Sequence, residues 1–136
     1  MIGQKFNIPK YDWDVKVYYD VKKEDIQFCF KQLRKLTTQG RYFRECYKTL
    51  YTNKRDRAYV YSSIRKQETV IFIGVPSSTG ELINTITHEA NHLKSHLATA
   101  YGLNEKDEEV CYVIGNIVEQ MSEVFINFIC CKVLDI

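Results

Sequence analysis

The first half of the chain alternates between strand-like and helix-like patterns of apolar side chains. Residues 1–12 follow neither pattern, and Pro9 predicts an irregular, extended segment there. Apolar and polar side chains alternate from Trp13 to Val21, which predicts a half-buried strand. Apolar residues then recur at helical spacing over residues 26–37, and a second, shorter helix fits residues 41–51.

The second half opens with two strand-like segments and closes with two long helical patterns. After a polar break at residues 53–56, residues 57–64 and 69–75 predict two strands, which a short link joins as an antiparallel hairpin. Apolar residues recur at helical spacing over residues 79–101 and again over about 105–133. The predicted order is β-α-(α)-β-β-α-α, an α+β fold with a small antiparallel sheet packed on helices.

The first of the two long helices has clear end signals and contains the most informative motif. Ser78 and Glu81 have the spacing of a capping box, and Gly102 supplies a stop. Mid-helix, residues 88–92 read H-E-x-x-H. On a helix, the first and last motif residues lie about 6 Å apart along the axis and about 40° apart around it.

Two imidazoles at this spacing are suited to hold one zinc ion. His88 and His92 can converge at the usual Zn–N distance of about 2.0–2.1 Å. Glu89, rotated by about 100° from His88, can take a proton from water that the metal activates. The motif fixes only three positions, so a chance match by surface or core histidines is the alternative. We interpret it as a zinc site with Glu89 as general base.

A catalytic zinc also needs a third protein ligand and one open position. His96 lies about 12 Å along the helix from His88, and three ligands in a row on one straight helix cannot form a tetrahedral corner. The next helix begins with Asp107, Glu108 and Glu109. Helix phase leaves Glu108 at the edge of the apolar stripe and turns Glu109 toward solvent, so Glu108 is preferred and Glu109 comes second. Alternatively, the three acids only stabilise the helix N-terminus.

Composition and charge narrow the class of protein. With 45% hydrophobic and 26% charged residues, the chain fits one globular domain over residues 1–136. The net charge of +2 hides an asymmetry: residues 1–75 hold 16 Lys/Arg against 8 Asp/Glu, and residues 76–136 hold 3 against 9. The acidic part suits a cation. The basic charges are scattered, which favours solvated surface and makes nucleic acid an unlikely partner.

The cysteines and the apolar runs indicate the compartment. Five cysteines occur without a C-x-x-C pair, and most fall inside apolar helical patterns, so we expect reduced, buried thiols at Cys29, Cys46, Cys111, Cys130 and Cys131. No apolar run follows a basic start, so no signal peptide is expected. The longest apolar run, Val124 to Cys131, is too short to span a bilayer. These features predict a cytoplasmic protein without a membrane partner.

The motif and its surroundings resemble a known family. Residues 84–93, which read N-T-I-T-H-E-A-N-H-L, and Glu108-x-x-x-Tyr112-Val113-Ile114-Gly115 are similar to small peptidases of bacteriophages and mobile elements in Bacteroides-type bacteria. Their pattern is N-T-x-x-H-E-x-x-H-L followed by E-x-x-x-Y-L-x-G, which looks like a minimal gluzincin-type zinc metallopeptidase. The resemblance spans residues 69–118. It implies a zincin-like domain, zinc ligation by Glu108, and an edge strand at Thr69–Gly74 that aligns an extended peptide beside the zinc.

The expected function is therefore zinc-dependent hydrolysis of a peptide or protein substrate. Zinc held by His88, His92 and Glu108 would polarise the scissile carbonyl, and Glu89 would pass a proton from water to the leaving amine.

Two questions stay open at this level. His96, Tyr101 and Tyr112 are candidate oxyanion donors by residue type alone, although packing between the two helices is favoured for Tyr112. The alternative function is a noncatalytic, zinc-braced interaction module, such as a phage structural or accessory protein. The lack of a cysteine suitably spaced from His88 favours an open, catalytic site. The oligomeric state is not indicated.

Overall fold

The computed structural model describes residues 1–51 and 58–134, with side chains as far as residue 127. The polar break predicted at residues 53–56 lies outside the described residues. So do three side chains that the sequence placed in the last helix, those of Phe128, Cys130 and Cys131.

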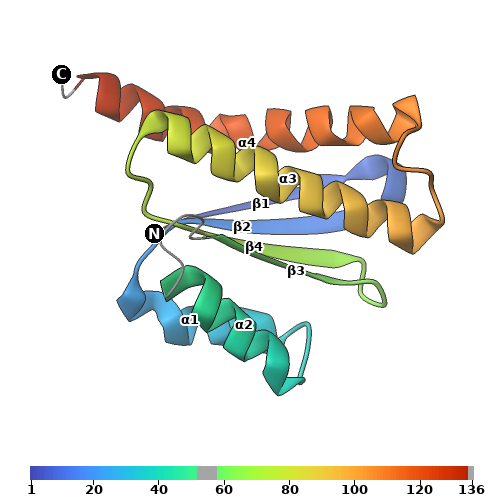
Figure 1. The fold of residues 1–136 in the computed structure, drawn as a ribbon, viewed down its shortest axis with the longest axis horizontal. Coiled ribbons are helices and arrows are strands. Elements are labelled where there is room, and N and C mark those ends of the chain that lie inside the picture. Colours follow the sequence, from blue (N-terminus) through green and yellow to red (C-terminus); the bar gives the residue numbers. More distant parts are fainter. Residues whose placement is uncertain (52–57, 135–136) are drawn as a thin grey trace. The chain divides into compact units, whose positions relative to one another are not determined.

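The chain divides into two compact units, Met1–Pro76 and Ser77–Ile136, and each is described by itself. The first unit is a four-stranded sheet with two helices. Its elements are β1 (Ile2–Ile8), β2 (Trp13–Val21), α1 (Ile26–Arg34), α2 (Gly40–Tyr51), β3 (Ala58–Ser63) and β4 (Glu68–Gly74), with short 3-10 turns at Pro9–Tyr11 and Lys23–Asp25. The strand order is β1-β2-β4-β3 (Figure 1). β1–β2 and β3–β4 are antiparallel, whereas β2 and β4 run parallel. The sheet is therefore mixed, and the expectation of an antiparallel sheet is wrong, because local patterns do not reveal the pairing of these two distant strands.

Strand β1 occupies residues that the sequence pattern left irregular. It pairs with β2 along its whole length, from Ile2 opposite Tyr19 to Ile8 opposite Trp13. Its alternation of apolar and polar residues is weak because only Phe6 and Ile8 are buried, as is common for a strand at the edge of a sheet.

The predicted α+β class and the predicted order of the other elements are confirmed.

Strand β4 lies in the interior of the sheet, and the expectation of an edge strand at Thr69–Gly74 is wrong. β4 is hydrogen-bonded to β2 on one side and to β3 on the other, so the edges are β1 and β3. The reason is visible in its composition, since every residue from Thr69 to Gly74 is buried. A continuous apolar run of this kind is typical of a strand covered on both faces.

One face of the sheet packs against α1 and α2. Both helices contribute a cysteine and a leucine to a buried cluster with residues of β3 and β4: Cys29, Leu33, Cys46, Leu50, Tyr59, Val70 and Phe72. The ring of Tyr18 stacks on Phe72 with centroids 5.8 Å apart and meets Phe28 of α1 edge-on at 5.0 Å. This packing turns the opposite sides of α1 and α2 toward solvent.

The other face of the sheet contains a buried hydrogen-bond network. The indole Nε1–H of Trp13 donates to Thr69 Oγ1 at 2.8 Å, and Ser62 Oγ lies 2.7 Å from the same oxygen. Trp13 and Thr69 are both 0% exposed. One threonine hydroxyl therefore connects β2, β4 and β3.

The second unit is a pair of helices, α3 (Thr79–Tyr101) and α4 (Glu108–Leu134), and α4 runs back alongside α3 (Figure 1). The predicted ends of α3 are confirmed. Ser78 Oγ accepts a hydrogen bond from the backbone N–H of Glu81 at 3.1 Å, and Gly102 ends the helix in the left-handed region with φ 63°. Among the described residues, no helix combines the length and apolar character that crossing a bilayer requires.

The apolar stripe predicted for α4 is largely confirmed. Val110, Ile117 and Met121 are buried, and Ile114 and Val124 are half-buried. Opposite them, α3 contributes a row of buried residues: Leu82, Ile86, Ala90, Leu93 and Leu97. The 3.6-residue period therefore predicts correctly which side of each helix is buried.

Candidate metal centre

His88 and His92 lie one turn apart on the exposed side of α3, with their rings turned toward each other. The two Nε2 atoms are 3.0 Å apart, and the rings meet edge-to-face with centroids at 4.6 Å and planes at 81°. A tetrahedral zinc with bonds of about 2.0–2.1 Å holds two nitrogens about 3.3 Å apart. The observed distance suits a shared metal after a small adjustment. It equally suits a hydrogen bond between two neutral rings, one of which donates.

The protonation state of His92 favours metal binding. Partial burial, reinforced by the nearby His88 ring, lowers the pKa of His92 below its usual value of 6.5. Burial also lowers the pKa of His96, with a further contribution from His92. His92 is therefore mainly neutral at pH 7, and neutral imidazole is the form that binds a metal.

Glu89 lies on a different side of α3 from the imidazoles. Its side chain is 3% exposed, and it shares the buried side of the helix with Ile86, Ala90 and Leu93. A carboxylate in such surroundings requires an interaction partner, and Glu89 has one. Its burial fits a general base shielded from bulk water, and it also fits a polar residue that fixes the packing of α3. The sequence pattern did not predict this burial.

Glu108 opens α4 and does not join the histidine pair. Its side chain is exposed, and its Oε1 accepts a hydrogen bond from Tyr112 OH at 3.3 Å. Within the described part of the chain, no group of three His, Cys, Asp or Glu side chains is placed to hold a metal. The physical reason is the length of α3, which continues from His92 to Tyr101 and thereby rises about 13 Å before the chain turns back.

The remaining candidates lie around the same two helices. Glu109 is exposed in the first turn of α4, beside Glu108. His96 is half-buried, and Tyr101 is exposed at the end of α3. Tyr112 is 71% exposed, so the expectation that it packs between the helices is wrong. Its ring points to solvent because its position falls outside the apolar stripe of α4.

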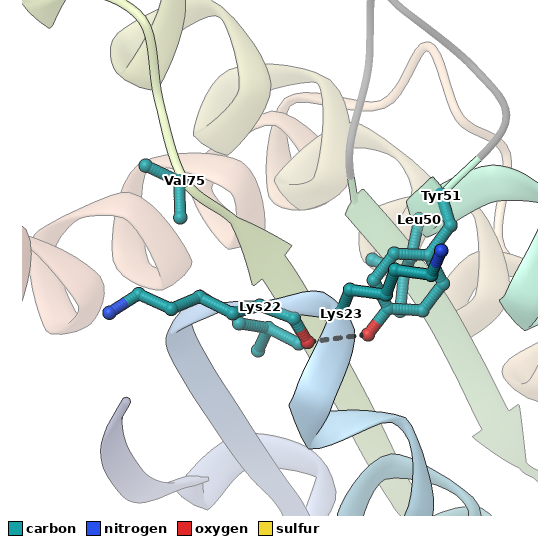
Figure 2. A pocket seen from close by; sticks show the side chains of 6 residues that line it. Lys22, Lys23, Leu50, Tyr51 and Val75 are labelled. Atoms are coloured by element: carbon teal, nitrogen blue, oxygen red, sulfur yellow. Dashed lines mark hydrogen bonds between the residues drawn. The ribbon is translucent and has the colours of Figure 1, made fainter.

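The structure also contains a pocket that the sequence did not indicate. It has a volume of about 270 Å³ and is lined by Val21, Lys22, Lys23, Leu50, Tyr51 and Val75 (Figure 2). Val21 ends β2, and Val75 follows β4, so the pocket lies at the carboxyl ends of the two parallel strands. Ligands of open sheets commonly bind at such a position. No sequence signal marks it, because its three segments meet only through the parallel pairing of β2 and β4.

Comparison of this chain with protein-family models, with curated proteins and with solved structures gives no match.

Proposed function

We propose that this chain is a zinc-dependent hydrolase, most simply a metallopeptidase, whose metal is held by His88 and His92. The observation that carries the proposal is the 3.0 Å separation of the two Nε2 atoms on the exposed side of one helix. The Ser78 cap and the Gly102 stop stabilise the two ends of α3, so the helix presents both rings in a fixed relation. The resemblance to small phage-related peptidases supports the same reading.

The two histidines are well placed for a zinc ion. In the described part of the chain, no third ligand lies beside them. Glu108 is proposed as that ligand on the resemblance and on helix phase. Because α3 rises about 13 Å between His92 and its end, ligation by Glu108 requires the connection at residues 102–107 to rearrange. Metal binding should therefore change the protection of these backbone amides against hydrogen exchange.

The chemical roles follow from the residue types. Zinc supplies Lewis-acid polarisation of a carbonyl and raises the acidity of water. Glu89 would accept a proton from a water molecule and deliver it to the leaving amine. His88 and His92 act only as ligands. The proposal includes a reducing, cytoplasmic setting, which the free thiols of Cys29 and Cys46 support.

A noncatalytic metal-binding module is the second candidate. The burial of Glu89 favours it, because a 3% exposed carboxylate on the apolar side of α3 is placed to fix helix packing. The two candidates differ in what Glu89 does after the metal is bound, and that difference is measurable.

The test replaces Glu89 by Gln and uses Glu119→Gln, an exposed position on α4, as the matched control. Zinc content is measured by elemental analysis, and hydrolysis is measured on a peptide library with and without chelator. The hydrolase proposal predicts that Glu89→Gln keeps its zinc and loses hydrolysis, whereas the control retains both. Zinc binding without chelator-sensitive hydrolysis in the wild type would establish the module instead.

A second comparison tests the third ligand. Glu108→Ala should weaken zinc binding at least 100-fold, roughly the upper end of the effect of removing an outer-shell partner, while the adjacent Glu109→Ala should leave it unchanged. Equal zinc affinity in the wild type and in Glu108→Ala would remove Glu108 from the site.

A further inference from the structure

The solvent-facing sides of α1 and α2 concentrate positive charge. Residues 26–51, which span both helices, contain six Lys/Arg and a single acidic residue, Glu45. All six basic side chains are exposed: Lys31, Arg34, Lys35, Arg41, Arg44 and Lys48. They form one row at spacing i, i+3, i+4 along α1 and its end, and a second at i, i+3, i+7 along α2, so each row follows one side of its helix.

The packing of the first unit explains how scattered charges become one surface. The apolar sides of both helices are buried against the same face of the sheet through Cys29, Leu33, Cys46 and Leu50. α1 and α2 lie on the same side of the sheet (Figure 1), so their two exposed basic rows face outward from one layer. We call this layer, with its six basic residues, the α1–α2 surface.

Aromatic rings lie among the basic side chains of α2. Tyr47 is 43% exposed, and its ring centroid lies 5.4 Å from that of Tyr51 in a tilted arrangement. The hydroxyl of Tyr51 donates to the backbone carbonyl of Lys22 at 2.7 Å, which holds the ring in place. The guanidinium of Arg41 lies over the ring of Tyr42, 4.6 Å from its centroid.

The pocket at the end of α2 continues this surface. Leu50 and Tyr51 form one wall, and the side chains of Lys22 and Lys23 extend from the turn in opposite directions (Figure 2). The pocket has a volume of about 270 Å³, and Tyr51 lines it. Positive charge, the exposed ring of Tyr47 and a concave site beside Tyr51 thus lie at the same end of α2.

We propose that the α1–α2 surface binds single-stranded nucleic acid. The two basic rows contact phosphates, Tyr47 stacks on a base, and the pocket beside Tyr51 receives another. Grooves that combine positive charge with stacking rings are the usual means of binding single strands. An acidic protein would match the charge without using the exposed ring of Tyr47, and a duplex would keep its bases away from that ring. The proposal does not depend on the zinc site.

The first experiment measures salt dependence with the full chain. Binding of a fluorescent 20-nucleotide oligo(dT) is followed by anisotropy between 50 and 200 mM salt. Six phosphate contacts predict that log K falls with log salt at a slope of about −4, because single strands give roughly −0.7 per contact. The triple variant Arg41→Gln, Arg44→Gln, Lys48→Gln should weaken binding and reduce the magnitude of the slope by about 2.

The matched control removes the same charge elsewhere. Lys5, Lys10 and Lys106 are exposed and lie outside the α1–α2 surface, and their triple replacement by Gln should leave the slope near that of the wild type. An equal loss of binding in both triple variants would show a general charge effect and overturn the proposal. No binding by the wild type at 50 mM salt would overturn it as well.

The second experiment tests the rings. Tyr47→Ala should weaken oligo(dT) binding about tenfold, the loss of one stacked base, with unchanged far-UV circular dichroism. Tyr11→Ala, a replacement of a tyrosine outside this surface, is the control and should bind as the wild type does. Tighter binding of a hairpin duplex of equal length, or no effect of Tyr47→Ala, would contradict the proposal. A His88→Ala, His92→Ala variant should bind oligo(dT) normally, which separates this test from that of the zinc site.

Discussion

The hydroxyl of Thr69 offers a direct test of how the sheet is held together. Its Oγ1 accepts a hydrogen bond from Trp13 Nε1 at 2.8 Å and lies 2.7 Å from Ser62 Oγ, within a region where Thr69 and Trp13 are 0% exposed. Thr69→Val keeps the branched shape and removes the hydroxyl. The change therefore isolates the polar contacts of three strands from their packing.

The expected cost follows from the burial. Depriving a buried N–H of an acceptor costs about 1–3 kcal/mol, and the lost contact with Ser62 adds about 1 kcal/mol. The extra buried methyl group offsets about 0.8 kcal/mol of this. We therefore expect Thr69→Val to lower the free energy of unfolding by about 2 kcal/mol.

The chain contains one tryptophan, so the assay reports on the perturbed site itself. Urea unfolding is followed through the shift of Trp13 fluorescence as the indole becomes exposed. Thr69→Ser, which keeps the hydroxyl and loses a methyl group, is the control and should show the smaller loss, about 1 kcal/mol. A Thr69→Val protein within about 0.5 kcal/mol of the wild type would refute the reasoning.

Three further predictions concern the ends of α3 and the thiols. Ser78→Ala should cost about 1 kcal/mol, because Ser78 Oγ caps the helix, and a thermal midpoint equal to that of the wild type would contradict this. Gly102→Ala should also destabilise by about 1 kcal/mol: an added Cβ meets nothing within 4 Å, so only the φ of 63° opposes it, and a stability gain would contradict that cause. Burial raises the pKa of Cys29 to about 12 and also raises that of Cys46, so both stay protonated at pH 8. Cys111, which was expected to be buried, is exposed, because it falls outside the apolar stripe of α4. Iodoacetamide at pH 8 should therefore modify Cys111 well before Cys29 or Cys46, as peptide mass spectrometry can show, and labelling at equal rates would refute the burial of those two thiols.

Helix boundaries set by local chemistry could be predicted from the sequence. The start of α3 depends on Ser78 and Glu81, and its end depends on Gly102, all within one turn of the boundary. The strand at Trp13–Val21 could also be predicted, because its alternating pattern of burial follows from its own sequence and not from the strands beside it.

Features that depend on distant segments could not be predicted. The parallel pairing of β2 with β4 joins residues more than fifty positions apart, such as Val15 and Thr69. That pairing places β4 inside the sheet and brings Val21 and Val75 to one pocket. Neither local propensity nor periodicity contains this information.

In the candidate site, too, local features could be predicted and features that depend on distant segments could not. The convergence of His88 and His92 is a property of one helical turn and was predictable. The position of Glu108 depends on how far α3 continues past the motif, and the burial of Glu89 depends on packing against that side of α3. Likewise, the basic residues of α1 and α2 appear scattered along the sequence until both helices pack on one face of the sheet.

A zinc titration tests the central claim, that His88 and His92 hold a metal, most directly. The metal-free protein is titrated with zinc in competition with a chelating dye, beside His92→Ala and beside His96→Ala, which removes a half-buried histidine from the same helix. We predict about one zinc per chain in the wild type, binding at least 100-fold weaker in His92→Ala, and little change in His96→Ala. Absence of zinc binding in the wild type, or equal losses in the two variants, would contradict the account.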